Sequence, residues 1–140
     1  MQNKLSASLE DYLEIICNLL ETSESVKAVE IAKKLNISRA SVSEALSKLS
    51  EKKLIIYEGH KGITITEEGL KKAKEVIKKH NTLTALFEEI LLLNRETSED
   101  IACKIEHIIS NDVFIRITQF LDYCRKNNQF TDNFRKTIQN

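Results

Sequence analysis

The sequence predicts a mainly α-helical protein that contains one two-stranded β-hairpin. Apolar residues recur at three- and four-residue spacing along most of the chain, which is the period of a helix with one buried face. All three glycines, Gly59, Gly62 and Gly69, fall in one short stretch, and the chain has no proline. Only in this stretch does the apolar period become alternating, in residues 63–66. Helices are therefore expected on both sides of a single hairpin.

Three helices are expected before the hairpin. Ser8 can cap a first helix that runs to about residue 20, because a serine side chain accepts from the free amide groups of the first turn. A short second helix covers residues 28–35. Ser38 then caps a third helix that runs to about residue 52, with its apolar side chains turned inward. Only two residues separate the second helix from the Ser38 cap, which indicates a tight turn.

The hairpin is expected to pair residues 55–58 with residues 63–66 around a turn at residues 59–62. A long helix follows to about residue 92, with acidic residues in its first turn, where the helix dipole favours negative charge. Ser98 begins the next helix, which runs to about residue 110, and Asn111 or Asp112 caps a last helix to about residue 125. The polar tail, residues 126–140, is expected to be loose.

A helix, a short helix, a tight turn, a third helix and a hairpin form the order of a winged helix-turn-helix. The predicted fold is an N-terminal winged helix-turn-helix with a two-stranded wing, residues 1–72, followed by an α-helical dimerisation domain, residues 73–140. The second part has more apolar side chains than a piece of its size can easily hide, which predicts a two-fold homodimer, with an ordinary monomer core as the alternative. The residues expected in this surface are Phe87, Ile90, Leu91, Leu92, Ile108, Phe114, Ile117, Phe120 and Leu121.

Composition excludes several classes of protein. No apolar run is long enough to span a membrane, and the N-terminus lacks an apolar signal core, so a cytoplasmic protein without membrane contact is expected. The three cysteines form no close pair, which suits a reducing compartment. The net charge is zero, yet residues 24–81 hold 13 Lys and Arg against 8 Asp and Glu, an excess of +5. A basic middle flanked by acidic ends is typical of a protein with one face that meets phosphate.

The helix that begins at Ser38 is the expected DNA-reading element, because the second helix of this motif places its N-terminal residues in the major groove. Arg39 can donate two hydrogen bonds to guanine, and Glu44 can accept from cytosine. Basic residues farther along are expected to touch the phosphate backbone, which adds affinity without sequence choice. The candidate DNA-binding residues are Ser38, Arg39, Ala40, Ser41, Ser43, Glu44, Lys48, His60 and Lys61. A winged helix that binds protein, or a helical piece that only packs, remains the alternative.

A second group of residues has the chemistry of metal ligands. Cys103, Glu106 and His107 share one face of a predicted helix, because positions i, i+3 and i+4 lie together. Asp11 and Glu14 share a face of the first helix in the same way. His80 lies on the long fourth helix. Sulfur, nitrogen and oxygen ligands from three helices suit a first-row divalent ion. Taken singly, each piece also fits a buried cysteine, a solvated polar face or an ordinary histidine.

The chain resembles the diphtheria-toxin-repressor and manganese-transport-regulator family of iron-dependent repressors. The resemblance runs through about residues 6–125 and rests on separate motifs in the family's order. These motifs are EDYLEII at 10–16, VS at 42–43, GITITEEG at 62–69, KH at 79–80 and CKIEHIIS at 103–110. The resemblance implies a winged helix, a helical dimerisation domain and metal at their junction. The chain stops where longer relatives continue into an SH3-like domain, so it resembles the short form.

The resemblance also implies a ligand set with mixed character. Five residues match the manganese-type ligands, whereas Cys103 is typical of the iron branch, and Thr84 replaces an acidic ligand of that branch's second site. Oxygen ligands favour Mn(II) or Fe(II), and a thiolate favours Fe(II), Zn(II) or Co(II). Fe(II) is therefore the first expectation and Mn(II) the near equal, with Zn(II) or Co(II) possible. The matching residues are Asp11, Glu14, His80, Glu106 and His107.

These observations predict a metal-dependent repressor that binds operator DNA as a homodimer and controls metal-homeostasis genes. Repulsion among Asp11, Glu14 and Glu106 without metal is expected to loosen the DNA-binding part, and a divalent ion to neutralise them. The alternative is a winged-helix regulator that needs no metal. An enzyme is not expected, because the chain lacks a glycine-rich phosphate loop, an oxyanion arrangement and a cofactor motif. No small organic substrate is expected either.

Overall fold

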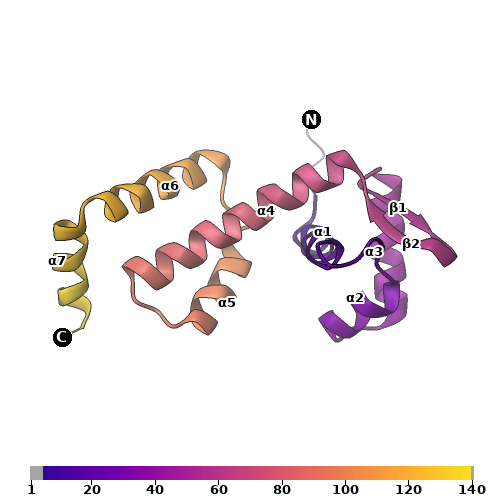
Figure 1. The fold of residues 1–140 in the computed structure, drawn as a ribbon, viewed down its shortest axis with the longest axis horizontal. Coiled ribbons are helices and arrows are strands. Elements are labelled where there is room, and N and C mark those ends of the chain that lie inside the picture. Colours follow the sequence, from indigo (N-terminus) through magenta and orange to yellow (C-terminus); the bar gives the residue numbers. More distant parts are fainter. Residues whose placement is uncertain (1–4, 140) are drawn as a thin grey trace. The chain divides into compact units, whose positions relative to one another are not determined.

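The computed structural model describes residues 5–139 and divides into two compact units, Met1–Glu75 and Val76–Asn140. The described part is mainly helical and has one two-stranded antiparallel hairpin after the third helix, as predicted (Figure 1). The boundary between the units falls inside the continuous helix α4, Glu67–Ala85. No helix in residues 5–139 is both long enough and apolar enough to cross a bilayer.

The first unit contains helices α1 (Ala7–Leu20), α2 (Ala28–Leu35) and α3 (Arg39–Glu51), followed by the hairpin. The helices surround an apolar core whose largest side chains are almost completely buried. Helix α1 packs against α3 and against the second hairpin strand. The large side chains of this core that are almost completely buried are Leu13, Ile16, Val26, Ile31, Val42, Leu46, Leu49, Leu54, Ile55 and Ile63.

Helix α1 begins two residues earlier than expected. Ser6, and not Ser8, is the N-cap, and its side chain accepts a hydrogen bond from the amide of Leu9 at 3.3 Å. Two serines stand within one turn of the helix start, so the sequence alone offers two equivalent caps. Helix α3 begins as predicted, because the Ser38 side chain accepts from the amide of Ser41 at 3.2 Å.

The hairpin consists of β1 (Ile55–Glu58) and β2 (Gly62–Ile65), joined by the 3₁₀ turn η1 (Gly59–Lys61). Its register pairs Ile55 with Ile65, so the second strand begins one residue before the expected position. Val26 forms a further antiparallel bridge to Ile63, which ties the loop before α2 to the hairpin. This bridge positions the wing within its own unit.

The start of α4 lies very close to the backbone of Lys53 and Leu54. The Thr66 hydroxyl donates to the carbonyl of Lys53 at 2.8 Å and accepts from the amide of Gly69 at 3.0 Å. A Cβ atom at Gly69 would lie 1.9 Å from the carbonyl oxygen of Leu54. Only glycine fits this crossing, which explains the third residue of the glycine cluster.

The second unit holds the rest of α4, then η2 (Leu86–Ile90), α5 (Arg95–Ile105), α6 (Asn111–Lys126) and α7 (Asn128–Ile138). The fourth helix was expected to run to about residue 92. Its α-helical part instead ends at Ala85, and five residues continue as a π-helix. A π-helix leaves some backbone groups without their usual partners, and other elements can then bind them.

Three boundaries in this unit differ from expectation. Asn94 caps α5 by accepting from the amide of Thr97 at 2.9 Å, so the helix does not begin at Ser98. Ser110, and not Asn111 or Asp112, caps α6. The tail was expected to be loose, but residues 128–138 form helix α7. The tail is polar apart from Phe130, Phe134 and Ile138, and its composition alone had suggested a loose segment.

Part of the apolar surface expected for a dimer is used inside the chain. Ile90 and Leu121 are 2% exposed and pack with Cys124 into the core of the second unit, so they are not surface residues. Phe87, Leu91, Phe114 and Ile117 are half-buried. Three members of the expected set are well exposed, namely Leu92, Ile108 and Phe120.

Candidate metal centre and nucleic-acid-binding surface

The exposed face of α3 carries most of the predicted DNA-reading side chains. Arg39, Ala40, Ser43 and Glu44 are all exposed. Ser47, one turn beyond Ser43, is exposed on the same helix and was not among the expected residues, although its spacing of four from Ser43 could have indicated it. This face carries no large apolar side chain, which suits a polar, charged partner.

Two of the predicted reading residues are engaged in the helix cap. The Ser38 hydroxyl accepts from the amide of Ser41 at 3.2 Å and lies 2.9 Å from the Ser41 hydroxyl. A hydroxyl used in this way holds the first turn of the helix rigid. The Ser38 side chain therefore stabilises the first turn of α3, besides any contact that it makes with a phosphate or base.

Glu44 is paired along the helix with Lys48. The Lys48 ammonium donates to the Glu44 carboxylate at 2.6 Å, and both side chains are more than half exposed. The hydrogen bond from Lys48 lowers the pKa of Glu44 below its usual value. Glu44 therefore stays ionised, an acceptor that can meet a cytosine amino group once Lys48 turns to a phosphate.

The wing presents its two predicted phosphate contacts at the tip. His60 and Lys61 lie in the η1 turn and are exposed. The Lys61 ammonium lies 3.2 Å from the Glu58 carboxylate. Because this ion pair is exposed and therefore weak, the Lys61 ammonium can leave Glu58 and bind a phosphate instead.

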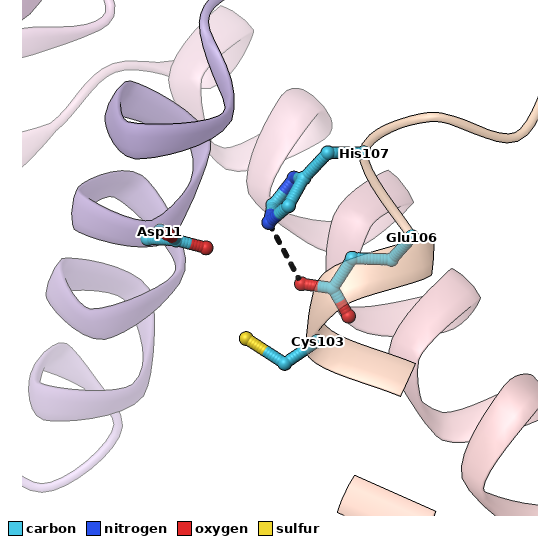
Figure 2. Close-up of side chains that lie close together, drawn as sticks. All are labelled: Asp11, Cys103, Glu106 and His107. Atoms are coloured by element: carbon cyan, nitrogen blue, oxygen red, sulfur yellow. Dashed lines mark ion pairs between the residues drawn. The ribbon is translucent and has the colours of Figure 1, made fainter. Parts of the chain in front are cut away.

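The candidate ligands of the second unit converge at the end of α5. Cys103 lies in the last turn of the helix, Glu106 is its C-cap, and His107 follows in the turn. The ligand atoms of these three side chains lie within 4.8 Å of one another. Figure 2 shows the thiol, the carboxylate and the imidazole pointing toward one another from this corner. It also draws Asp11, the residue of α1 in the expected ligand set.

Glu106 is a buried carboxylate placed between two imidazoles. Its side chain is 0% exposed; Oε2 lies 2.7 Å from Nδ1 of His80, and Oε1 lies 3.3 Å from Nε2 of His107. The second contact has ion-pair distance without hydrogen-bond geometry, and Oε1 accepts no hydrogen bond from any residue that the structure describes. A buried carboxylate oxygen without a donor is costly unless a cation is bound there.

The second unit therefore brings three of the predicted ligands together, namely Cys103, Glu106 and His107. His80 on α4 contacts the same Glu106 carboxylate. Thiolate, carboxylate and imidazole form a donor set that fits a first-row divalent ion. The three residues were expected on one helix, but α5 ends at Ile105, so Glu106 and His107 lie at the C-cap and in the turn that follows.

The remaining expected ligands, Asp11 and Glu14, lie one turn apart on α1 of the first unit, and both are half-buried. Their spacing of three places both carboxylates on one face of the helix. Thr84 lies one turn after His80 on α4, is 7% exposed, and its hydroxyl forms no hydrogen bond with the described residues.

Comparison with known proteins covers nearly the whole chain. Residues 4–63 match the model of the iron dependent repressor N-terminal DNA binding domain. Residues 66–132 match the iron dependent repressor metal binding and dimerisation domain. The two matches follow each other in the order expected from the sequence motifs.

Individual relatives agree with these matches. An uncharacterised HTH-type transcriptional regulator of Methanocaldococcus jannaschii is 37% identical over 119 residues, which are 84% of this chain and 95% of that protein. The HTH-type transcriptional regulator MntR of Oceanobacillus iheyensis is 30% identical over 132 residues, covering 94% of this chain and 89% of the relative. These relatives are transcription regulators by name.

Solved structures show the same fold. A manganese-dependent transcriptional repressor in complex with manganese superposes with a TM-score of 0.75 at 25% identity, covering 82% of this chain and 53% of that one. The manganese regulator SloR gives a TM-score of 0.74 at 30% identity, with 82% and 54% covered. The chain thus spans about half the length of these two solved proteins.

Proposed function

The chain belongs to the iron-dependent repressor family, whose members are transcription regulators and not enzymes, and we propose that it represses metal-homeostasis genes when loaded with Fe(II) or Mn(II). In this proposal, residues 1–72 bind operator DNA and residues 73–140 bind metal and form a homodimer. The observation that carries the proposal is the buried Glu106 carboxylate, held between His80 and His107 and close to Cys103.

The proposed ligand set is Cys103, Glu106, His107 and His80 from the second unit, with Asp11 and Glu14 from α1. A bound divalent ion would supply the positive charge that several carboxylates on one site require. Glu106 and the two imidazoles orient one another before any ion arrives, so little rearrangement is needed within the second unit. The two α1 carboxylates are expected to respond to the ion by fixing the first helix.

The choice of metal follows from the donor atoms. Carboxylate oxygens favour Mn(II) and Fe(II), whereas the Cys103 thiolate favours Fe(II), Zn(II) or Co(II). A ligand set that mixes carboxylates with a thiolate therefore favours Fe(II) first and Mn(II) second. Solved relatives in complex with manganese, cadmium and zinc support a site of this kind that accepts more than one ion.

DNA recognition is assigned to α3 and the wing. Arg39, Ser43 and Glu44 are the base-reading candidates, because they project from the first two turns of the helix. Lys48, His60 and Lys61 supply phosphate contacts. Metal acts as a switch only if it binds the DNA-competent arrangement more tightly than the others.

The test is an anaerobic titration of metal-stripped protein with Fe(II), Mn(II), Zn(II) and Co(II), read by fluorescence anisotropy of its own promoter DNA. One ion is expected to raise DNA affinity at least tenfold, about 1.4 kcal/mol of coupling. Glu106→Ala should remove this increase, and Asp100→Ala, an exposed acidic residue of the same helix, should keep it. Equal DNA binding with every ion and with chelator would favour the metal-independent regulator instead.

A further inference from the structure

A pocket between α1 and α3 adjoins the DNA-reading face of the first unit. It has a volume of about 280 Å³ and is lined by Tyr12 on α1 and by Glu44 and Lys48 on α3. The remaining lining residues are Ser6, Ser8, Leu9, Ser41 and Ala45. Predicted DNA-binding residues therefore share a pocket with a residue of α1, the helix that also carries Asp11 and Glu14.

Among the lining residues, only Tyr12 is both polar and buried. It is 7% exposed, and its hydroxyl forms no hydrogen bond with any residue in the range 5–139. Most buried tyrosine hydroxyls have a partner, because a polar group that loses water without gaining a hydrogen bond costs free energy. The pocket thus holds a hydrogen-bond donor that the described part of the chain does not use.

The serine hydroxyls of the pocket are less suited to bind a further group. The Ser6 hydroxyl accepts from an amide in the first turn of α1 at 3.3 Å, and the Ser41 hydroxyl lies 2.9 Å from that of Ser38. These contacts belong to helix caps, whose geometry fixes the hydroxyl positions. Ser8 is exposed, so its hydroxyl keeps its hydration. Tyr12 therefore has the most to gain from a polar partner that enters the pocket.

Glu44 shares the pocket with Tyr12 but is bound to another residue. Burial, and after it the negative charge of Glu44, raise the pKa of Tyr12 above its usual value. The phenol therefore keeps its proton and meets a carboxylate only as a donor. The Glu44 carboxylate accepts from the Lys48 ammonium at 2.6 Å, and the two side chains are 69% and 54% exposed. Such an exposed pair contributes little to stability, so Glu44 can change partners.

We propose that Tyr12 is a positioning residue for base recognition: when Lys48 binds a DNA phosphate, the Tyr12 hydroxyl donates to the Glu44 carboxylate and holds it in one orientation. This inference rests on the base-reading role of Glu44 in the proposed function and adds the residue that orients it. A carboxylate has two oxygens with about four lone pairs, so Glu44 can accept from Tyr12 and from a cytosine amino group at the same time.

A fixed orientation increases the selectivity of Glu44 for one base. A glutamate side chain has several rotamers, and restricting them on binding costs conformational entropy. A hydroxyl that donates to the charged carboxylate forms a short bond, and it offsets part of this cost by ordering the side chain in advance. Removal of the Tyr12 hydroxyl should therefore weaken the preference for one base pair more than it weakens DNA binding as a whole.

The first experiment measures discrimination between operator sequences. The full chain, saturated with Mn(II), is titrated against its own promoter DNA and against copies with one base pair changed at a time, read by fluorescence anisotropy. Glu44→Ala identifies the base pair that Glu44 reads. Tyr12→Phe keeps the ring and is expected to lower discrimination at that base pair at least threefold, with other positions within twofold. Tyr123→Phe, at an exposed tyrosine of α6, is the matched control and should change neither.

A double-mutant cycle then tests whether Tyr12 acts through Glu44. In the Glu44→Ala background, Tyr12→Phe should change discrimination by less than 1.5-fold, because no carboxylate is left to orient. An equal effect in both backgrounds would overturn the proposal, since Tyr12 would then act independently of Glu44. A purely structural role would instead weaken binding to every sequence alike and lower the melting temperature, and this result would also overturn it.

The outcomes distinguish this inference from the proposed function. If Glu44→Ala leaves discrimination unchanged at every base pair, the base-reading role of Glu44 fails and this inference fails with it. If Glu44→Ala lowers discrimination and Tyr12→Phe does not, only this inference is overturned. Tyr12 is next to the expected ligand Asp11, so Co(II) affinity is measured from the absorption spectrum and should agree within twofold between wild type and Tyr12→Phe. A tenfold loss of Co(II) affinity with unchanged discrimination would assign the hydroxyl to the metal site and overturn the proposal.

Discussion

Apolar surface is distributed very differently between the two units. Of the thirteen large apolar side chains that are more than a third exposed among the described residues, ten lie in the second unit. The first unit exposes only Ile37, Ile56 and Tyr57 in this class. Conversely, the second unit buries a carboxylate, Glu106, completely. The first unit has a closed apolar core and a polar face on α3, whereas the second combines a buried carboxylate with many exposed apolar side chains.

Because of this difference, the residues that stabilise the fold and the residues that are available for binding can be distinguished in each unit. In the first unit, the buried side chains stabilise the fold, and the exposed polar face of α3 is free for a partner. In the second unit, the buried carboxylate and the exposed aromatic residues both oppose the stability of an isolated chain. A divalent ion and a second copy would remove these two costs. Substitutions in the two units should therefore change different measurements.

The largest loss of stability is expected from the core of the first unit. Leu46 is 0% exposed and lies on the inner face of α3. Leu46→Ala should lower the free energy of unfolding by about 3 kcal/mol, because it removes apolar contacts and leaves a cavity. Urea unfolding followed by circular dichroism measures this change. Ser47→Ala, its exposed neighbour, should stay within about 0.5 kcal/mol. Similar values for both would mean that this core is not closed.

Glu106→Gln is expected to weaken metal binding while leaving the free energy of unfolding nearly unchanged. The amide keeps the shape of the side chain but removes a buried negative charge, so the unfolding free energy of metal-free protein should change by less than about 1 kcal/mol. Metal affinity should fall at least a hundredfold, about 2.7 kcal/mol, since a neutral amide is a much weaker ligand. Isothermal titration with Mn(II) and urea unfolding give the two numbers. Asp100→Asn, an exposed position, is the matched control. A large loss of stability with intact metal affinity would assign Glu106 to the fold alone.

A smaller effect is expected where the start of α4 approaches Leu54, in the segment between α3 and β1. Gly69→Ala places a Cβ atom against the Leu54 carbonyl and should cost about 2 kcal/mol, although alanine normally favours a helix. Gly59→Ala in the wing meets no atom within 4 Å and should be nearly neutral. Thermal unfolding of the two variants compares them directly. Equal melting temperatures would show that the crossing relaxes at little cost.

The fold could be predicted at positions where the residue types allow only one local structure. The glycine cluster and the alternating residues 63–66 identified the hairpin, and the spacing of Cys103, Glu106 and His107 identified the shared corner at the end of α5. Ser38 was correctly assigned as a cap. The π-helical turn after Ala85 was not predictable, because η2 packs against α5 and α6, and these contacts with later helices cannot be read from the local sequence.

Helix boundaries and α7 show the limits of local patterns. Several serines and asparagines near each helix start can serve as caps, and only the packed structure selects Ser6, Asn94 or Ser110. Helix α7 was missed because the polar composition of the tail was taken to predict a loose segment, although Phe130, Phe134 and Ile138 follow at the spacing of four that is typical of a helix face.

The smallest predicted effect concerns the ion pair at the base of α7. The hydrogen bonds from Arg125 to the Glu89 carboxylate, at 2.6 and 2.8 Å, lower the pKa of Glu89. Because the folded pKa lies below the unfolded value, the stabilisation is present above the usual glutamate range and is lost as pH falls through the lowered pKa. Both side chains are at least 40% exposed, so the contribution should stay below about 1 kcal/mol.

Hydrogen exchange measured between pH 6 and pH 3.5, after correction for the intrinsic rate, tests this expectation. Protection of α7 amides should decrease on acidification, since Arg135 holds α7 to the carbonyl of the same Glu89 residue. Glu89→Gln should show reduced protection already at pH 6 and a weaker further change. Core amides of α3, around Leu46, are expected to keep their protection over most of this range. If α3 and α7 lose protection together, the two units unfold as one, and the contrast between a closed unit and an incomplete one does not extend to their stability.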